Sequence, residues 1–127
     1  MHKTLLLIVP LLLGGCQTWG PTWSELSGRR ITKVEMNRLP TIIERVDGQG
    51  AFASHPIKIE PGKRELVLQG PTPDRPGGAV LQTYTLVAEP CKRYYINAQY
   101  DNPIDNRWTP VIDFVEEIAG CKIVAKS

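Results

Sequence analysis

Arg93-Tyr94-Tyr95-Ile96-Asn97-Ala98-Gln99-Tyr100 is the stretch of this sequence that decides the fold. Tyr94, Ile96, Ala98 and Tyr100 occupy every second position of it. A period of two places such residues on one face of a β-strand, because successive side chains of a strand point to opposite sides. We therefore predict a strand whose Tyr94–Tyr100 face lies in a hydrophobic core.

Shorter segments with the same pattern lie on both sides of this strand, separated by turn residues at intervals of roughly eight to twelve positions, as is typical of an all-β sandwich or barrel. Asp47-Gly48 and Pro61-Gly62 are the clearest turns, and Pro61-Gly62 suits a type II turn. Residues 108–117 are expected to form a strand with Ile112 and Phe114 facing inward. The other segments with the pattern are 31–36, 41–46, 56–59, 64–69, 79–88 and 121–124. We predict a small antiparallel β-sandwich of about seven strands.

Size and charge narrow the possible partners. The chain has 127 residues, a length typical of one domain, with 15 Lys and Arg against 13 Asp and Glu. Nucleic-acid binding requires a clustered basic face. The basic residues here form only short pairs, Arg29-Arg30, Lys63-Arg64 and Lys92-Arg93. We expect no nucleic-acid partner.

The N-terminus has the pattern of a secretory signal. Lys3 precedes an apolar run over 4–13, which is long enough for a signal peptide but shorter than the roughly 20 residues that span a bilayer. Pro10 disfavours the alternative, a buried helix. Leu13-Gly14-Gly15-Cys16 then resembles the lipobox of bacterial lipoproteins, in which the cysteine receives a diacylglyceryl group and becomes the acylated N-terminus. The resemblance implies that 1–15 is removed and that palmitate-type chains on Cys16 anchor the protein to a membrane.

The residue after the cysteine bears on location. In enteric lipoproteins an aspartate there commonly retains the protein at the inner membrane, so Gln17 favours the outer membrane, with the domain facing the periplasm. Residues 16–30 are rich in Gly, Ser, Thr and Pro, and we expect them to carry the lipid and tether a domain over 31–127. Trp19 and Trp23 either insert among lipid headgroups or pack against the domain edge, and packing is favoured because indoles bury large areas.

Cys91 and Cys121 remain as a pair in an oxidising compartment. Each stands at the start of a predicted strand, so a disulfide between them would join strand ends. The enclosed loop would stabilise the fold by about 3–4 kcal/mol on the chain-entropy argument. The alternative, a reactive or metal-binding thiol pair, lacks the C-x-x-C spacing. We predict a structural disulfide.

The sequence offers little catalytic chemistry. His2 lies in the leader, and His55 lies in a turn where a histidine is usually solvated. No nucleophile elbow, phosphate-binding loop or zinc motif occurs. Asp113, Glu116 and Glu117 could act as paired carboxylates, but an exposed strand face explains them more simply. We expect no enzyme, no catalytic residue, no cofactor and no metal.

Two loops are the candidate contact surfaces, because loops on a rigid sandwich commonly carry binding. They span 70–78 and 101–107, and their candidate contact residues are Asp74, Arg75, Asp101, Asn102, Asp105 and Asn106. The oxygen-bearing side chains of the second loop would also suit calcium. Asn and Asp are equally what turns require, and the turn interpretation is favoured.

Three segments carry a family resemblance: IEPGKRELVL (59–68), CKRYYINAQY (91–100) and WTPVIDF (108–114). Together they resemble the PEGA-like or transthyretin-like β-sandwich modules of bacterial envelope lipoproteins, in which a Pro-Gly turn leads into a strand and a Tyr-Tyr strand crosses the core. The resemblance implies no catalytic residues. It favours a non-enzymatic module that binds an envelope protein; the alternative is an inhibitor of a wall hydrolase or a small-ligand-binding lipoprotein.

Overall fold

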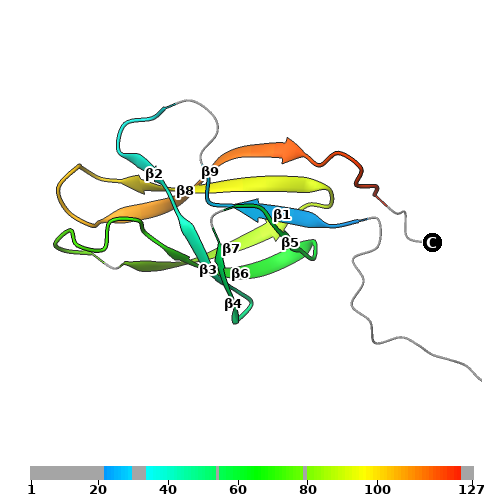
Figure 1. Cartoon of the computed structure of the whole chain (residues 1–127), viewed down its shortest axis with the longest axis horizontal. Helices are drawn as coiled ribbons and strands as arrows, with labels where there is room; N and C mark the ends of the chain where they lie inside the picture. The colour runs from blue at the N-terminus through cyan, green and yellow to red at the C-terminus, as the bar shows by residue number, and fades with distance from the viewer. Residues whose placement is uncertain (1–21, 30–33, 54, 79, 124–127) are drawn as a thin grey trace, which may run out of the picture.

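The structure is a computed structural model that describes residues 22–29, 34–53, 55–78 and 80–123. The predicted signal peptide, the lipobox, Cys16 and Trp19 lie outside these ranges. Figure 1 shows two β-sheets stacked as layers, with their long strands running along the length of the domain. Within the described ranges, no helix has the length and apolar character to cross a membrane.

The described part of the chain forms nine strands. They are β1 (Ser24–Ser27), β2 (Arg38–Pro40), β3 (Ile42–Val46), β4 (Gln49–Ala53), β5 (Ile57–Ile59), β6 (Gly62–Gln69), β7 (Leu81–Ala88), β8 (Lys92–Tyr100) and β9 (Trp108–Glu117). One sheet contains β1, β2, β5, β8 and β9, and the other has the order β4-β3-β6-β7. The all-β sandwich is thereby confirmed.

Strand β8 organises the first sheet. It pairs with β9 on one side and with two short strands on the other: β1 runs parallel to its first half, and β2 antiparallel to its second half. Between β1 and β2, the Thr41 hydroxyl donates to the Ile96 carbonyl at 2.7 Å, which satisfies the β8 backbone where the partner changes. The sandwich therefore contains one parallel pair and is not purely antiparallel.

The predicted core face of β8 is confirmed. Tyr94, Ile96, Ala98 and Tyr100 are at most 7% exposed and pack against the facing sheet. The remaining buried core residues are Leu26, Ile43, Ile59, Leu66, Leu68, Leu86, Ala88 and Trp108. At the entry to β6, Gly62 has φ +111°, which is the positive φ that the predicted type II turn needs.

The first correction concerns the tether. Ser24–Ser27, which we expected to be linker, forms β1 and is buried at all four positions, so the folded domain begins before residue 31. Its polar side chains are satisfied within the fold: the Ser24 hydroxyl donates to the Glu89 carbonyl at 2.7 Å, and Glu25 accepts from Arg93. Trp23 packs at the domain edge, as predicted, with Lys58 Nζ 4.3 Å from its ring centroid.

The strand count is also corrected. Residues 34–36 of the expected first strand are not in a strand, and 31–33 lie outside the described ranges. Residues 121–123 are likewise outside any sheet, because Cys121 is held by its disulfide and not by ladder pairing. Strands β1, β2 and β4 were not predicted, and each is five residues or shorter.

A β-bulge in β9 explains why the expectation for Phe114 is wrong. Ile96 pairs with Ile112 and the preceding Tyr95 pairs with Phe114, which leaves Asp113 as an extra residue. One extra residue reverses the alternation of faces. Ile112 therefore packs against the core as predicted, whereas Phe114 lies outside, 42% exposed, beside the Tyr95 ring.

Candidate contact surface

The two candidate loops lie against each other at one end of the sandwich. The Asn106 N–H donates to the Pro76 carbonyl at 2.9 Å, and the Thr72 hydroxyl donates to Asn106 Oδ1 at 3.0 Å. In Figure 1 the loops between β6 and β7 and between β8 and β9 form the left end of the domain, away from the C-terminus. They therefore form one surface, which we call the two-loop surface (70–78 and 101–107).

Asn106 joins the loops and does not face a partner. It is 1% exposed, which corrects its expected role as a contact residue. Gly78 allows this approach: its φ is +72°, and a Cβ atom there would lie 2.6 Å from the Asn106 carbonyl oxygen. Only glycine readily takes this conformation and leaves this space.

Arg75 and Asp74 lie in the first loop. The Arg75 guanidinium lies 4.8 Å from the centroid of the Tyr100 ring, a cation–π arrangement. The Tyr100 hydroxyl is in turn 2.7 Å from the Thr72 hydroxyl. Asp74 is exposed in a turn. Arg75 is thus held in place by the end of β8, while Asp74 faces solvent.

The second loop uses its polar side chains to shape its own backbone. Asn102 Oδ1 accepts hydrogen bonds from the N–H groups of Ile104 at 2.8 Å and Asp105 at 3.0 Å. Asp105 pairs with the Arg107 guanidinium at 2.7 Å, which lowers the pKa of Asp105 to about 2. Asp101, which is exposed, donates its N–H to the Arg107 carbonyl at 3.0 Å. These contacts are the turn role that Asn and Asp were expected to play.

The two-loop surface therefore offers a mixed chemistry. Asp74, Asp101 and Arg107 supply exposed charges, and Ile104 is an exposed apolar side chain at 71%. Ile104 was not predicted as a contact, although an isoleucine inside a polar loop is the signal that could have indicated it. Such a mixture of charge and apolar area is typical of the rim and centre of a protein–protein contact.

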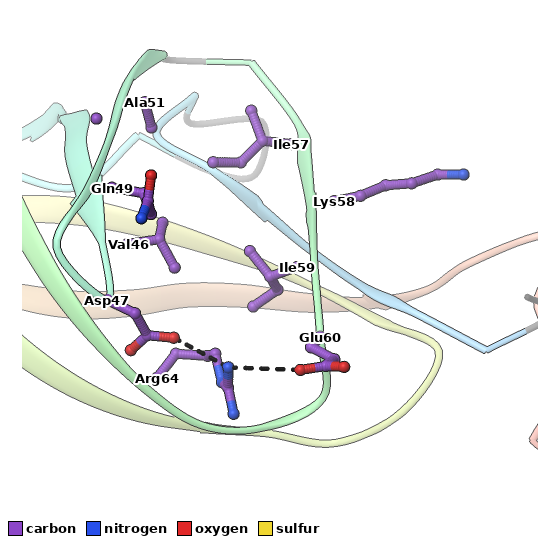
Figure 2. Close-up of a pocket in the computed structure, with 10 residues that line it drawn as sticks. Val46, Asp47, Gln49, Ala51, Ile57, Lys58, Ile59, Glu60 and Arg64 are labelled. Carbon is purple, nitrogen blue, oxygen red and sulfur yellow. Dashed lines mark hydrogen bonds and ion pairs between the residues drawn. The ribbon is translucent and has the colours of Figure 1, made fainter. Parts of the chain in front are cut away.

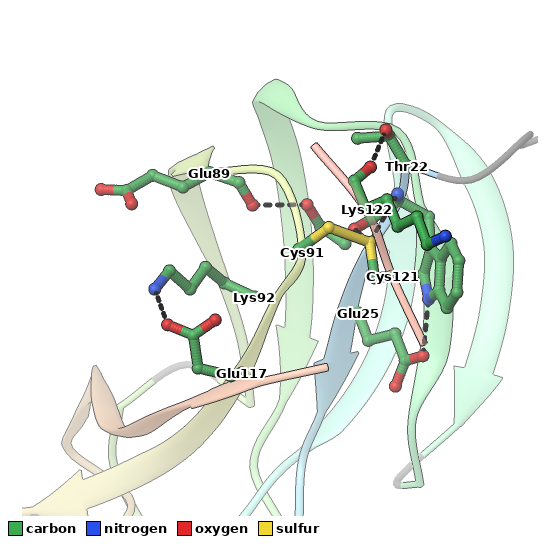
Figure 3. The surroundings of a disulfide bond; sticks show 10 residues. Thr22, Glu25, Glu89, Cys91, Lys92, Glu117, Cys121 and Lys122 are labelled. Carbon is green, nitrogen blue, oxygen red and sulfur yellow. Dashed lines mark hydrogen bonds and ion pairs between the residues drawn. A yellow bond between two sulfur atoms is a disulfide. The ribbon is translucent and has the colours of Figure 1, made fainter. Parts of the chain in front are cut away.

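The opposite end of the domain is closed by the predicted disulfide. Cys91 and Cys121 are bonded, with their Cα atoms 5.4 Å apart, as Figure 3 shows. The Cys91 N–H donates to the Trp23 carbonyl at 2.8 Å, and the Thr22 hydroxyl donates to the Lys122 carbonyl. The start of the described chain, at Thr22, and its end, at Cys121 and Lys122, thus meet at this disulfide.

The three acidic residues of β9 are held by cations. Asp113 pairs with Arg38 at 2.7 Å, and Glu117 pairs with Lys92 at 2.6 Å. Glu116 accepts from the Tyr95 hydroxyl at 2.6 Å and from Arg93 at 2.7 Å, and these two bonds lower the pKa of Glu116.

Arg93 lies on the outer face of the sheet that contains β8. In addition to Glu116, it bonds Glu25 at 2.7 Å. This bond and those from Arg93 to Tyr95 and Glu116 raise the pKa of Arg93. His55, the other catalytic candidate considered, is exposed between β4 and β5. In the described ranges, no three His, Cys, Asp or Glu side chains gather as a metal-binding group.

A cleft that the sequence did not predict opens between β4 and β5, as Figure 2 shows. Its volume is about 440 Å³. Val46, Ala51, Ile57 and Ile59 give it an apolar lining. At one end Arg64 spans the cleft, 2.9 Å from Asp47 and 3.9 Å from Glu60.

The cleft could not be read from the sequence, because its walls come from four strands and the turns between them. Comparison with protein families, with curated proteins and with solved structures finds no match to this chain.

Proposed function

We propose that this protein is a non-enzymatic lipoprotein of the bacterial envelope, anchored through lipid on Cys16 and binding another envelope protein through the two-loop surface. We place it at the outer membrane, facing the periplasm. The proposal rests on one observation: Thr22 and the two-loop surface lie at opposite ends of the sandwich. The described chain starts at Thr22 beside the disulfide, and the two-loop surface lies at the other end.

Chain length supports this arrangement. Six residue steps separate Cys16 from Thr22, and an extended chain of that length reaches at most ~20 Å. Strand β8 runs nine residues from the disulfide end toward the two-loop surface, a distance of about 30 Å. A lipid on Cys16 would therefore hold the disulfide end near the membrane and present the two-loop surface to the periplasm.

The ion pairs of the carboxylates on β9 also support a binding role and not a catalytic one. The three carboxylates of β9 each pair with an arginine or lysine. A general acid or base instead needs a group whose proton is free to move to a substrate.

Crosslinking in cells tests the proposal. A photoreactive residue is placed at Ile104 on the two-loop surface, and the matched control carries it at Lys58, which is exposed on β5. We expect one discrete adduct from the Ile104 position, lost or strongly reduced in a Cys16→Ala background. No discrete adduct from Ile104, or the same adduct from both positions, would contradict the proposal.

The cleft supports a second candidate, a small-ligand-binding lipoprotein. Its apolar lining and charged end suit a small amphiphilic molecule. An amphiphilic dye such as anilinonaphthalene sulfonate provides a direct probe. Saturable binding to the native protein that is lost in Ala51→Trp, which fills the cleft, would favour this candidate. Binding that Ala51→Trp leaves unchanged would dismiss it.

A further inference from the structure

The edge strands of the two sheets differ in how they are protected against pairing with other chains. Unpaired strand edges invite pairing with other chains, and natural proteins blunt them with short strands, prolines, bulges and charges. Strands β2 and β5 are three residues each, and Pro40 lies within β2. Strand β4 contains a bulge opposite β3, with Phe52 at φ +51°. Strand β9 carries Pro110, the bulge at Asp113 and three acidic residues.

Strand β7 has none of these devices. It is eight residues long, with the sequence LQTYTLVA, and contains no proline, glycine or charged residue. All eight residues pair in unbroken register with β6 on one side, and among the described residues no strand pairs with the other side of β7. It is therefore a regular and uncharged edge in a domain whose other edges are protected.

We propose that the free edge of β7 binds an extended segment of a partner protein, which adds to the sheet as a further strand. This inference rests on the proposed function and names the kind of partner that it needs. Backbone hydrogen bonds along the edge supply affinity in this mode of recognition, and the alternating side chains supply specificity.

The edge is continuous with the two-loop surface. The Gly70 N–H donates to the Val80 carbonyl at 2.8 Å, so the first loop closes immediately before β7 begins. The Gln82 side-chain amide donates to the Trp108 carbonyl at 2.9 Å, which ties the start of β7 to the first residue of β9, directly after the second loop. The first loop of the two-loop surface therefore leads directly into β7, and β9 lies against β7 at this end.

The side chains of β7 indicate the chemistry of the segment. Leu81, Thr83, Thr85 and Val87 share the outer face and are exposed, Leu81 at 45% and Val87 at 68%. Apolar and β-branched residues are the favoured cross-strand neighbours of such a row. The predicted segment is therefore uncharged, extended and rich in Val, Ile, Thr or aromatic residues at alternate positions.

Anchoring favours a different protein over a second copy. Antiparallel pairing of two β7 strands places Leu81 of one copy beside Ala88 of the other. The seven residue steps between them offset the two disulfide ends by about 23 Å. The ~20 Å reach from Cys16 to Thr22 is shorter than this offset. Antiparallel pairing of two upright copies anchored in one membrane is therefore disfavoured.

Crosslinking in cells with the full lipidated chain begins the test. A photoreactive residue is placed in turn at Thr83 on β7, at Ile104 on the two-loop surface and at Gln49, an exposed residue on the opposite edge of the same sheet. We expect Thr83 and Ile104 to give adducts of the same mass and Gln49 to give none. The crosslinked segment of the partner is then synthesised as a peptide.

Hydrogen exchange on the full mature chain with that peptide tests the mode of binding. We expect the rapidly exchanging amides of 81–88 to become protected, because their outward N–H groups enter the new ladder. Thr83→Lys should weaken peptide binding roughly fivefold by placing a charge at the strand pair, whereas Gln49→Lys should not. Unchanged melting temperatures check that both variants are folded.

The results distinguish a failure of the β7 edge proposal from a failure of the proposed function. Adducts at Ile104 without any at Thr83 would overturn the edge proposal and leave the proposed function standing. An adduct at twice the protein's own mass would show that two copies of this chain are crosslinked, and would overturn the proposal that the partner is a different protein. Adducts at neither position would overturn both, and a peptide that binds without protecting 81–88 would overturn strand addition.

Discussion

Asn106 and Pro76 belong to different loops and are joined by a backbone hydrogen bond of 2.9 Å, donated by Asn106 to the Pro76 carbonyl. The same asparagine accepts the Thr72 hydroxyl through its side chain. Residues 30 positions apart in the sequence thus build one surface from two turns. This relationship turns two separate candidate loops into a single site.

Replacing the Asn106 side chain should loosen the contact between the loops, while its backbone bond to Pro76 remains. Asn106→Ala leaves the Thr72 hydroxyl without this acceptor in a buried place, so we expect the free energy of unfolding to fall by about 1–2 kcal/mol. Urea denaturation measures the change, and the Ile104 crosslink should weaken with it. Asp74→Ala, at an exposed position of the first loop, is the matched control and should change stability by less than about 0.5 kcal/mol. Equal effects of the two substitutions would contradict the role given to Asn106.

Removing the disulfide should cost more than any single contact. The bond closes a loop of 30 positions, and the double variant Cys91→Ala, Cys121→Ala should lower the free energy of unfolding by about 3–4 kcal/mol. Urea denaturation of this variant, beside wild-type protein in the presence of a reductant, measures the loss. The two samples should agree closely. A wild-type protein whose stability does not respond to reductant would contradict the prediction.

Arg93 should be a sensitive charged residue of the outer sheet face. It bonds Glu25, whose side chain is only 11% exposed, so Arg93→Ala leaves a nearly buried carboxylate short of its cation. We expect a loss of about 2 kcal/mol in the free energy of unfolding. Lys92→Ala is the neighbouring control, because its partner Glu117 is 81% exposed and solvent replaces the pair. Comparable losses in both variants would show that burial of Glu25 is unimportant.

Acid should weaken the two-loop surface through Asp105. Because Arg107 lowers the pKa of Asp105 from 3.8 to about 2 in the folded state, its contribution to stability is present above about pH 4 and is lost as the pH falls toward 2. Asp105→Asn should remove this part of the pH dependence. Urea denaturation from pH 5 to pH 2 should show the stability difference between wild type and variant shrinking with acid. A difference that is independent of pH would refute this origin.

The sequence was most informative where the hydrophobic period was long. Strand β8 carries apolar residues at every second position from Tyr94 to Tyr100, and these four residues were correctly placed in the core. Strand β9 was predicted with its observed bounds, Trp108–Glu117. In β8 the pairing partner and the side-chain pattern agree, so local sequence and tertiary packing favour the same structure, whereas in β9 the agreement ends at the bulge.

Short polar strands were missed for a physical reason. The four residues of β1 include two serines and a glutamate, a composition that resembles a linker. They become a strand because Glu89 and Arg93, more than sixty positions away, satisfy their polar groups. The sequence does not display such long-range partners.

The candidate site was predictable only in part. The loops were identified by their composition, and the Asx turn at Asn102 follows from its chemistry. The burial of Asn106 and the outward position of Phe114 depend on a contact between loops and on a bulge. A bulge shifts the alternation of faces by one residue, and the alternating pattern of the sequence does not show where such a shift occurs.

The central claim, that this is a lipid-anchored envelope protein, is tested most directly by mass spectrometry of the N-terminal peptide from the membrane fraction of expressing cells. We expect the mature chain to begin at Cys16 and to carry a diacylglyceryl group and acyl chains on that residue. The Cys16→Ala variant should be lost from the membrane fraction. A chain that retains residues 1–15, or one that is cleaved elsewhere and has an unmodified Cys16, would contradict it.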